Sequence, residues 1–115
     1  MNTQHALISD ILFGLRHRLA EWEKAEADQH ETALDEELWI VRIDNFAYKV
    51  DGDVCHPVVM QPGLVGVPRY TRKNAEMIAS HRGHECKISY CNDVRREVIE
   101  ELKVMITQLE AILVS

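Results

Sequence analysis

The sequence is poor in cysteine, in glycine-rich motifs and in long apolar runs, and each shortage excludes a class of protein. Three cysteines in 115 residues allow at most one disulfide within the chain, which is not the pattern of a secreted disulfide-stabilised domain. The apolar runs are too short for a membrane-spanning helix or a signal peptide. No G-x-G-x-x-G or P-loop pattern points to a particular nucleotide. We therefore expect a reduced, cytoplasmic protein without a membrane segment.

Lysine and arginine are also missing from residues 26–37, the stretch that holds most of the net charge of −6. An acidic field opposes nonspecific binding to nucleic acid and to anionic membranes, so we expect a protein partner with a basic surface at this stretch. The plainer alternative is a solvated connection between a helix and a sheet. The acidic residues that would contact the partner are Glu26, Asp28, Glu31, Asp35, Glu36 and Glu37.

The two ends of the chain are strongly amphipathic and predict long helices over 1–26 and 92–115. Apolar residues recur in both at alternating spacings of four and three, which is typical of a coiled-coil seam. We therefore predict a homodimer that associates through one or both helices. The alternative is that each helix packs within one subunit. The N-terminal stripe is Ile8, Leu12, Leu15, Leu19 and Trp22, and the C-terminal stripe, the predicted interface, is Val98, Leu102, Met105, Leu109 and Ile112.

Short alternating segments between these helices predict strands. Asp44 and Asn45 interrupt the first alternation and predict a tight turn, and Gly52 predicts a second hairpin. Pro57 cannot donate to a ladder, so the third strand is expected at an edge of the sheet. A helix capped by Thr71 follows, and the last strand is expected over 85–91.

These elements predict one α+β domain over 1–115 in the order α-β-β-β-α-β-α. The sheet is expected to be small, four-stranded and mostly antiparallel, with helices on one face. We expect Asn92 or Asp93 to cap the C-terminal helix. The parts are the N-terminal helix 1–26, the acidic linker 27–37, the sheet with its inserted helix 38–91, and the C-terminal helix 92–115.

Histidine and cysteine gather in one segment, "SHRGHECKISYC" at 80–91, and raise the question of zinc. Cys86 and Cys91 are an odd number of positions apart on a predicted strand, so their side chains would point to opposite faces. A four-ligand site then needs a residue from another strand, and the candidate set is His81, His84, Cys86 and Cys55. The alternative is a helix end followed by small buried thiols. We expect no cofactor, with zinc as the alternative.

Positive charge surrounds the start of the inserted helix, in "VPRYTRKNAE". Helix N-termini favour acidic residues, yet Arg69, Arg72 and Lys73 flank the cap at Thr71. The pattern favours a bound anion, such as a nucleotide or an acidic protein surface. Glu76 or the acidic linker could instead supply the counter-charge.

No catalytic residue can be assigned from the sequence. Cys55 and His56 are neighbours on a predicted strand and therefore face opposite ways, so they cannot form a hydrogen-bonded dyad. This favours a binding protein over an enzyme, with a cysteine-dependent or zinc-stabilised module as an alternative.

The layout from "WIVRIDNFAYKVDGD" to "GVPRYTRKNAEMIASH", an apolar hairpin followed by a capped, alanine-containing helix, resembles that of small phage-encoded accessory proteins. The resemblance implies a protein of the host cytoplasm that inhibits or regulates a defence or regulatory complex by binding to it. A sensor or sponge for a small anionic ligand, held at Arg69, Thr71, Arg72 and Lys73, is the alternative.

Overall fold

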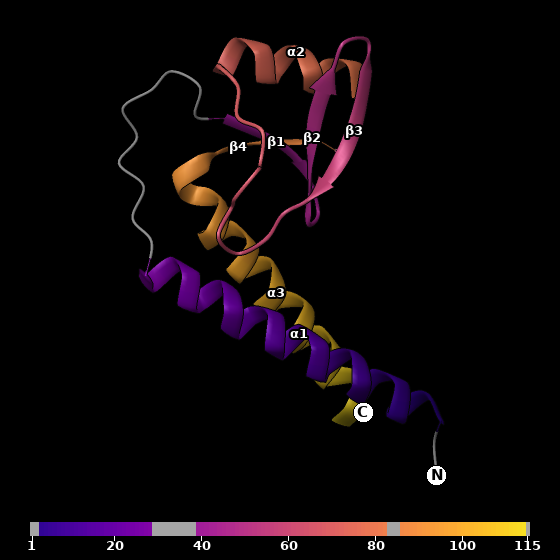
Figure 1. Ribbon diagram of the computed structural model, residues 1–115. Coiled ribbons are helices and arrows are strands. Elements are labelled where there is room, and N and C mark those ends of the chain that lie inside the picture. Colours follow the sequence, from indigo (N-terminus) through magenta and orange to yellow (C-terminus); the bar gives the residue numbers. More distant parts are fainter. Residues whose placement is uncertain (1–2, 29–38, 83–85, 115) are drawn as a thin grey trace.

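A computed structural model describes residues 3–28, 39–82 and 86–114 (Figure 1). The order of helices and strands confirms the predicted α+β class and the sequence α-β-β-β-α-β-α. None of the described helices is long and apolar enough to cross a membrane. The elements are α1 (Thr3–Asp28), β1 (Trp39–Ile43), β2 (Phe46–Asp51), β3 (Val54–Val59), α2 (Arg72–Arg82), β4 (Lys87–Tyr90) and α3 (Cys91–Val114).

The four strands form one antiparallel sheet in the order β3-β2-β1-β4. Strand β3 therefore lies at an edge, as the proline at position 57 predicted. Both hairpins turn where the sequence indicates. Asp44 takes a φ of 49° in the first turn and Gly52 a φ of 63° in the second, and short polar residues and glycine tolerate this left-handed region best.

Helices cover both faces of the sheet, so the expectation of one covered face was wrong. Arg42 in β1 contacts Glu97 and Glu101 of α3, and Trp39 in the same strand lies 4.4 Å beneath the guanidinium of Arg72 in α2. Even and odd positions of β1 thus face different helices. Ile40, Val41 and Arg42 are all buried, as is typical of a strand covered on both faces.

The two long helices pack against each other as an antiparallel pair on one face of the sheet (Figure 1). Arg16 in the middle of α1 pairs with Glu110 near the end of α3 at 2.9 Å, and Glu26 near the end of α1 lies 4.0 Å from Arg96 near the start of α3. The predicted stripe of α1 is buried at Ile8, Leu12, Leu15 and Trp22, and it joins the apolar face of α3 in the main core. Each helix thus finds its apolar partner within one chain.

The helical pair extends past the sheet as an arm (Figure 1). The molecule measures 52 × 32 × 19 Å and has a Cα radius of gyration of 16.3 Å. A compact domain of this length would have a radius of gyration of about 13 Å. Among the described elements, the distal part of α1 and α3 is therefore a layer of two helices with no third one packed on it.

The boundary between β4 and α3 lies earlier than predicted. Cys91 is the first residue of α3 and is buried, so neither Asn92 nor Asp93 is its N-cap. The argument that Cys86 and Cys91 alternate along one strand was wrong, because β4 comprises only Lys87–Tyr90. Because α3 follows β4 without a connecting loop, no loop residue is present to act as the predicted side-chain cap.

Candidate binding surfaces

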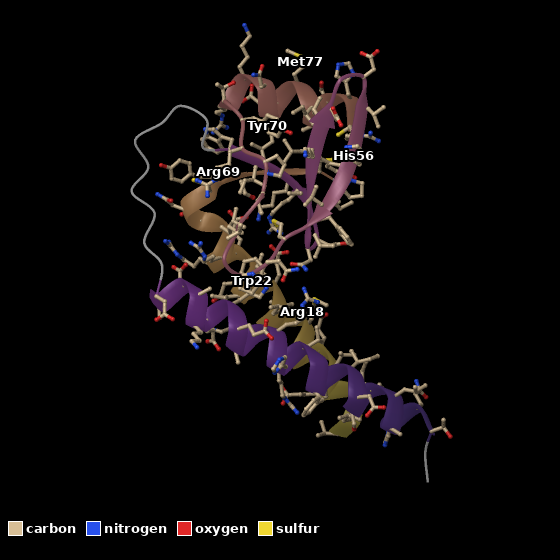
Figure 2. All side chains as sticks on the ribbon, in the orientation of Figure 1. Arg18, Trp22, His56, Arg69, Tyr70 and Met77 are labelled. Carbon is tan, nitrogen blue, oxygen red and sulfur yellow. The ribbon has the colours of Figure 1, made fainter. Side chains whose placement is uncertain are left out.

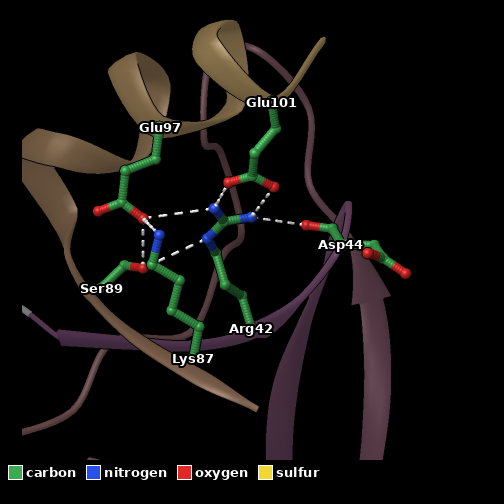
Figure 3. Close-up of polar contacts among 6 residues, drawn as sticks. All are labelled: Arg42, Asp44, Lys87, Ser89, Glu97 and Glu101. Atoms are coloured by element: carbon green, nitrogen blue, oxygen red, sulfur yellow. Dashed lines mark hydrogen bonds and ion pairs between the residues drawn. The ribbon is translucent and has the colours of Figure 1, made fainter. Parts of the chain in front are cut away.

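The root of the arm contains a cluster of charged residues around the guanidinium of Arg42 (Figure 3). Arg42 is only 1% exposed, and its Nη1 donates to the carbonyl oxygen of Asp44 at 2.7 Å. Its Nη2 contacts the carboxylates of Glu97 at 3.3 Å and of Glu101, and its Nε donates to Ser89 Oγ at 3.3 Å. A buried charge is tolerated when it is paired and hydrogen-bonded in this way. The cluster joins β1 and β4 to α3 and so fixes the arm relative to the sheet.

Glu97 is the titratable centre of this cluster. Burial raises its pKa, but the hydrogen bonds from Ser89 and Lys87 and the positive charges of Lys87 and Arg42 outweigh burial, so the pKa of Glu97 is lowered. Ser89 Oγ donates to Glu97 Oε1 at 2.7 Å, and Lys87 Nζ lies 3.0 Å from the same oxygen. The carboxylate is therefore ionised at neutral pH.

A corner between the arm and the sheet holds a cavity of about 350 Å³. Arg18 of α1 lines it from the side of the helix that faces the sheet (Figure 2). Asn45, in the turn between β1 and β2, also lines it, and the Oδ1 atom of Asn45 is buried without a hydrogen-bond partner among the described residues. The corner thus presents the cation of Arg18 beside the apolar side chains of Phe46 and Met105.

The predicted dimer residues fall into two groups in the structure. Val98 and Leu102 are buried in the core of the single chain, and Leu109 packs against that core. Met105 is 44% exposed and Ile112 is 45% exposed. The structure therefore corrects the predicted interface: Val98 and Leu102 pack within one subunit, and only the distal half of the stripe is open to a second molecule.

The exposed half of this stripe continues across onto α1. Leu7 and Ile11 lie one turn apart on α1 and are both exposed. We use the name arm face for the surface of Leu7, Ile11, Met105 and Ile112. It leads toward the corner, since Met105 lines both. A contiguous exposed apolar surface of this kind marks an interaction site more often than a solvated surface.

A second cavity, of about 610 Å³, lies between α2 and the hairpin of β2 and β3. Val50, Val54 and Cys55 line it from the hairpin, and Met77 and Ile78 line it from the helix. The polar groups at this cavity are Asp53, His81 and Arg82. Arg82 donates from Nη2 to the carbonyl oxygen of Cys55 at 2.7 Å, and its guanidinium lies 5.4 Å from the centroid of the Tyr48 ring.

The basic start of α2 is largely engaged within the chain. Thr71 caps the helix as predicted, because its Oγ1 accepts from the amide of Asn74 at 3.2 Å. The side chain of Arg72 stacks on Trp39 and donates to Glu76 Oε1 at 3.0 Å. Glu76 therefore supplies the counter-charge for Arg72. Lys73 is exposed, and Arg69 is half-buried with Tyr70 beside it (Figure 2).

The predicted acidic and metal-binding residues are only partly described. Glu26 and Asp28 form part of α1, and Glu26 lies 4.0 Å from Arg96 of α3. Cys55 and His81 line the same cavity, whereas Cys86 precedes β4. No group of three or more histidine, cysteine or acidic residues lies close enough to hold a metal among the described positions. Glu31, Asp35, Glu36, Glu37 and His84 lie outside the described residues.

Charge is unevenly divided between the two halves of the molecule. The sheet half, residues 39–82 and 86–90, has seven Lys and Arg against four Asp and Glu. The helical pair, α1 and α3, has six against ten. Two of the seven cations, Arg42 and Lys87, pair with carboxylates of α3, so the remainder of the sheet half is close to neutral and the acidity of the chain lies mainly in the helices.

Comparison with known proteins found no match, so the geometry of the surfaces described above is the basis for assigning a function. No family model, no curated protein and no solved structure matches the chain.

Proposed function

We propose that this chain is a non-catalytic binding protein that acts as a weak homodimer and regulates a macromolecular partner. The observation that carries the proposal is the arm face, which extends beyond the sheet with four exposed apolar side chains. In water such side chains favour association, because burial of apolar surface is the main driving force for it. The resemblance to phage accessory proteins remains a prediction about the partner.

A two-fold dimer must use a surface that is complementary to itself. The arm face meets this condition, because its apolar tip at Leu7 and Ile112 can enter the corner of a second copy while its own corner receives the second tip. The corner supplies apolar contacts at Phe46 and a cation at Arg18. Association in this way would bury apolar side chains that the single chain leaves exposed.

The size of the arm face sets the strength of the dimer. The exposed stripe of α3 runs from Met105 to Ile112, which is about 10 Å of helix at roughly 1.5 Å per residue. An interface of this length is smaller than stable specific interfaces and falls in the range of transient ones. We therefore expect a dissociation constant in the micromolar range.

The basic residues Arg69 and Lys73 at the start of α2 favour an acidic partner surface. In a dimer joined through the arms, the two sheets lie at opposite ends, so both copies of these residues remain available at once. A partner that contacts both would gain from avidity. The acidic stretch 26–37 is the alternative contact, with a basic partner.

Sedimentation velocity and light scattering over a concentration series test the dimer. The wild-type mass is expected to rise from 13.3 kDa toward twice that value over the micromolar range. The double variant Met105→Glu and Ile112→Glu, at exposed positions, should remain monomeric with unchanged circular dichroism. Leu7→Glu should act in the same direction through the other helix.

Phe13→Glu is the matched control for this experiment. Phe13 is 77% exposed on α1 but lies about 120° around the helix from Leu7 and about 160° from Ile11, counted at 100° per residue. It should dimerise like the wild type. A wild-type protein that stays monomeric at high micromolar concentration contradicts the proposal, as does a double variant that associates normally. Leu102→Glu would test folding instead, because Leu102 is buried.

A further inference from the structure

The cavity between α2 and the β2–β3 hairpin has apolar walls that are left open by the residues the structure describes. Val50, Val54 and Met77 line it and are among the most exposed large apolar residues of the sheet half. Its volume of about 610 Å³ falls within the range of about 300–1,000 Å³ for pockets that hold small organic ligands. Apolar walls with a few polar groups are also typical of such pockets.

One end of the cavity has a positioned cation. Arg82 is anchored by a single hydrogen bond to the Cys55 carbonyl oxygen and by the Tyr48 ring. A guanidinium has five N–H donors, so most of its donors have no acceptor among the described residues. A fixed guanidinium loses little side-chain freedom on binding and is well suited to a carboxylate. His81, on the same turn of α2, adds a second nitrogen donor or acceptor at this end.

The geometry points to an amphipathic organic monoanion as the ligand of this cavity, namely a carboxylate that carries an apolar chain. The carboxylate would accept hydrogen bonds from Arg82, and the chain would lie against Val50, Val54 and Met77. Asp53, on the hairpin side, would repel a second negative charge, which favours a monoanion over a phosphate ester or a dicarboxylate. This site is separate from the arm face and does not depend on the dimer.

Three ten-carbon probes below their micelle concentrations separate this chemistry from nonspecific apolar binding. They are decanoate, decanol and decyltrimethylammonium, titrated into the full-length protein labelled at its methionine and valine methyl groups. Decanoate should shift the methyl signals of Met77 and Val54 in a saturable way, and it should bind about tenfold more tightly than decanol, as one charge-assisted hydrogen-bond pair implies. The cationic probe should bind most weakly.

Single substitutions test whether decanoate binds in the cavity between α2 and the hairpin. Arg82→Gln should weaken decanoate about tenfold and leave decanol unchanged, and Asp53→Asn should strengthen decanoate. Arg72→Gln, at the other end of α2, is the matched control and should bind like the wild type. Equal affinity for the three probes would overturn the inference. So would the absence of saturation at millimolar decanoate, shifts confined to the arm, or an Arg82→Gln variant with wild-type affinity.

Discussion

Arg42 and Glu97 connect the sheet to α3 through charge, at a position where most small domains use only apolar side chains. Breaking such a pair leaves a buried charge without its partner, which is far more harmful than losing a surface pair. The cluster also contains Ser89 and Lys87, whose donors hold the Glu97 carboxylate in its ionised form. Glu97 is thus the group in this cluster whose pKa is lowered by its surroundings.

The stability of the protein should fall in acid through this carboxylate. Because the pKa of folded Glu97 lies below its ordinary value of 4.5, Glu97 contributes stability above that pH and loses the contribution as the pH falls through the folded pKa. Glu97→Gln should lower the free energy of unfolding by about 1 kcal/mol at pH 7. The difference from wild type should shrink below pH 4, in urea denaturation at a series of pH values.

Glu100→Gln provides the control for that experiment. Glu100 lies on α3 three residues away, its side chain is largely exposed, and its ion pair with Lys103 spans 3.6 Å. Exposed pairs contribute little, so its pH profile should match the wild type. A Glu97→Gln profile parallel to wild type at every pH would contradict the role assigned to Glu97.

At the scale of elements, α2 depends on its cap more than the long helices do. It has only 11 residues, a length at which an isolated helix is marginal, and Thr71 satisfies an amide of its first turn. Thr71→Ala should therefore lower the free energy of unfolding by about 1 kcal/mol. Thr71→Ser keeps the oxygen and should restore most of it. Equal losses in both variants would mean that the methyl group matters, and not the cap.

The helices and strands were predictable because their signals are local. Stripes at spacings of three and four, the turn residues Asp44 and Gly52 and the cap at Thr71 each act within a few positions. The side of the sheet on which each helix packs was not predictable. The apolar stripe of α3 predicts that Val98 and Leu102 are buried against another apolar surface. It does not predict that α1 of the same chain provides that surface.

The Arg42 cluster and the two cavities could not be predicted from the sequence either. Arg42 and Glu97 are separated by 55 positions, and a lone arginine on a strand is usually read as an exposed residue. Arg95, which is buried and donates to the carbonyl oxygen of Pro62 at 3.0 Å, was missed for the same reason. Nothing local marks a charged side chain whose acceptors come from a distant loop or helix.

At the scale of the whole molecule, the arm makes the protein longer than its mass suggests. Small-angle scattering extrapolated to zero concentration should give a radius of gyration near the 16.3 Å of the Cα positions, slightly raised by hydration. The value should increase with concentration as arms pair, and it should stay constant for Met105→Glu with Ile112→Glu. A dilute value near 13 Å, that of a compact domain, would mean that the arm folds back on the sheet.

The antiparallel pairing of α1 with α3 also governs how the chain folds as it is made. Residues 29–90 must leave the ribosome before the first part of α3 can reach α1, and the contact between Arg16 and Glu110 spans 94 positions. Until then the stripe of α1 has no surface to bury it, since its core partners belong mainly to the last helix. Domains form only after such distant contacts can close. During synthesis the apolar stripe of α1 is consequently exposed to water, and the tertiary core forms late.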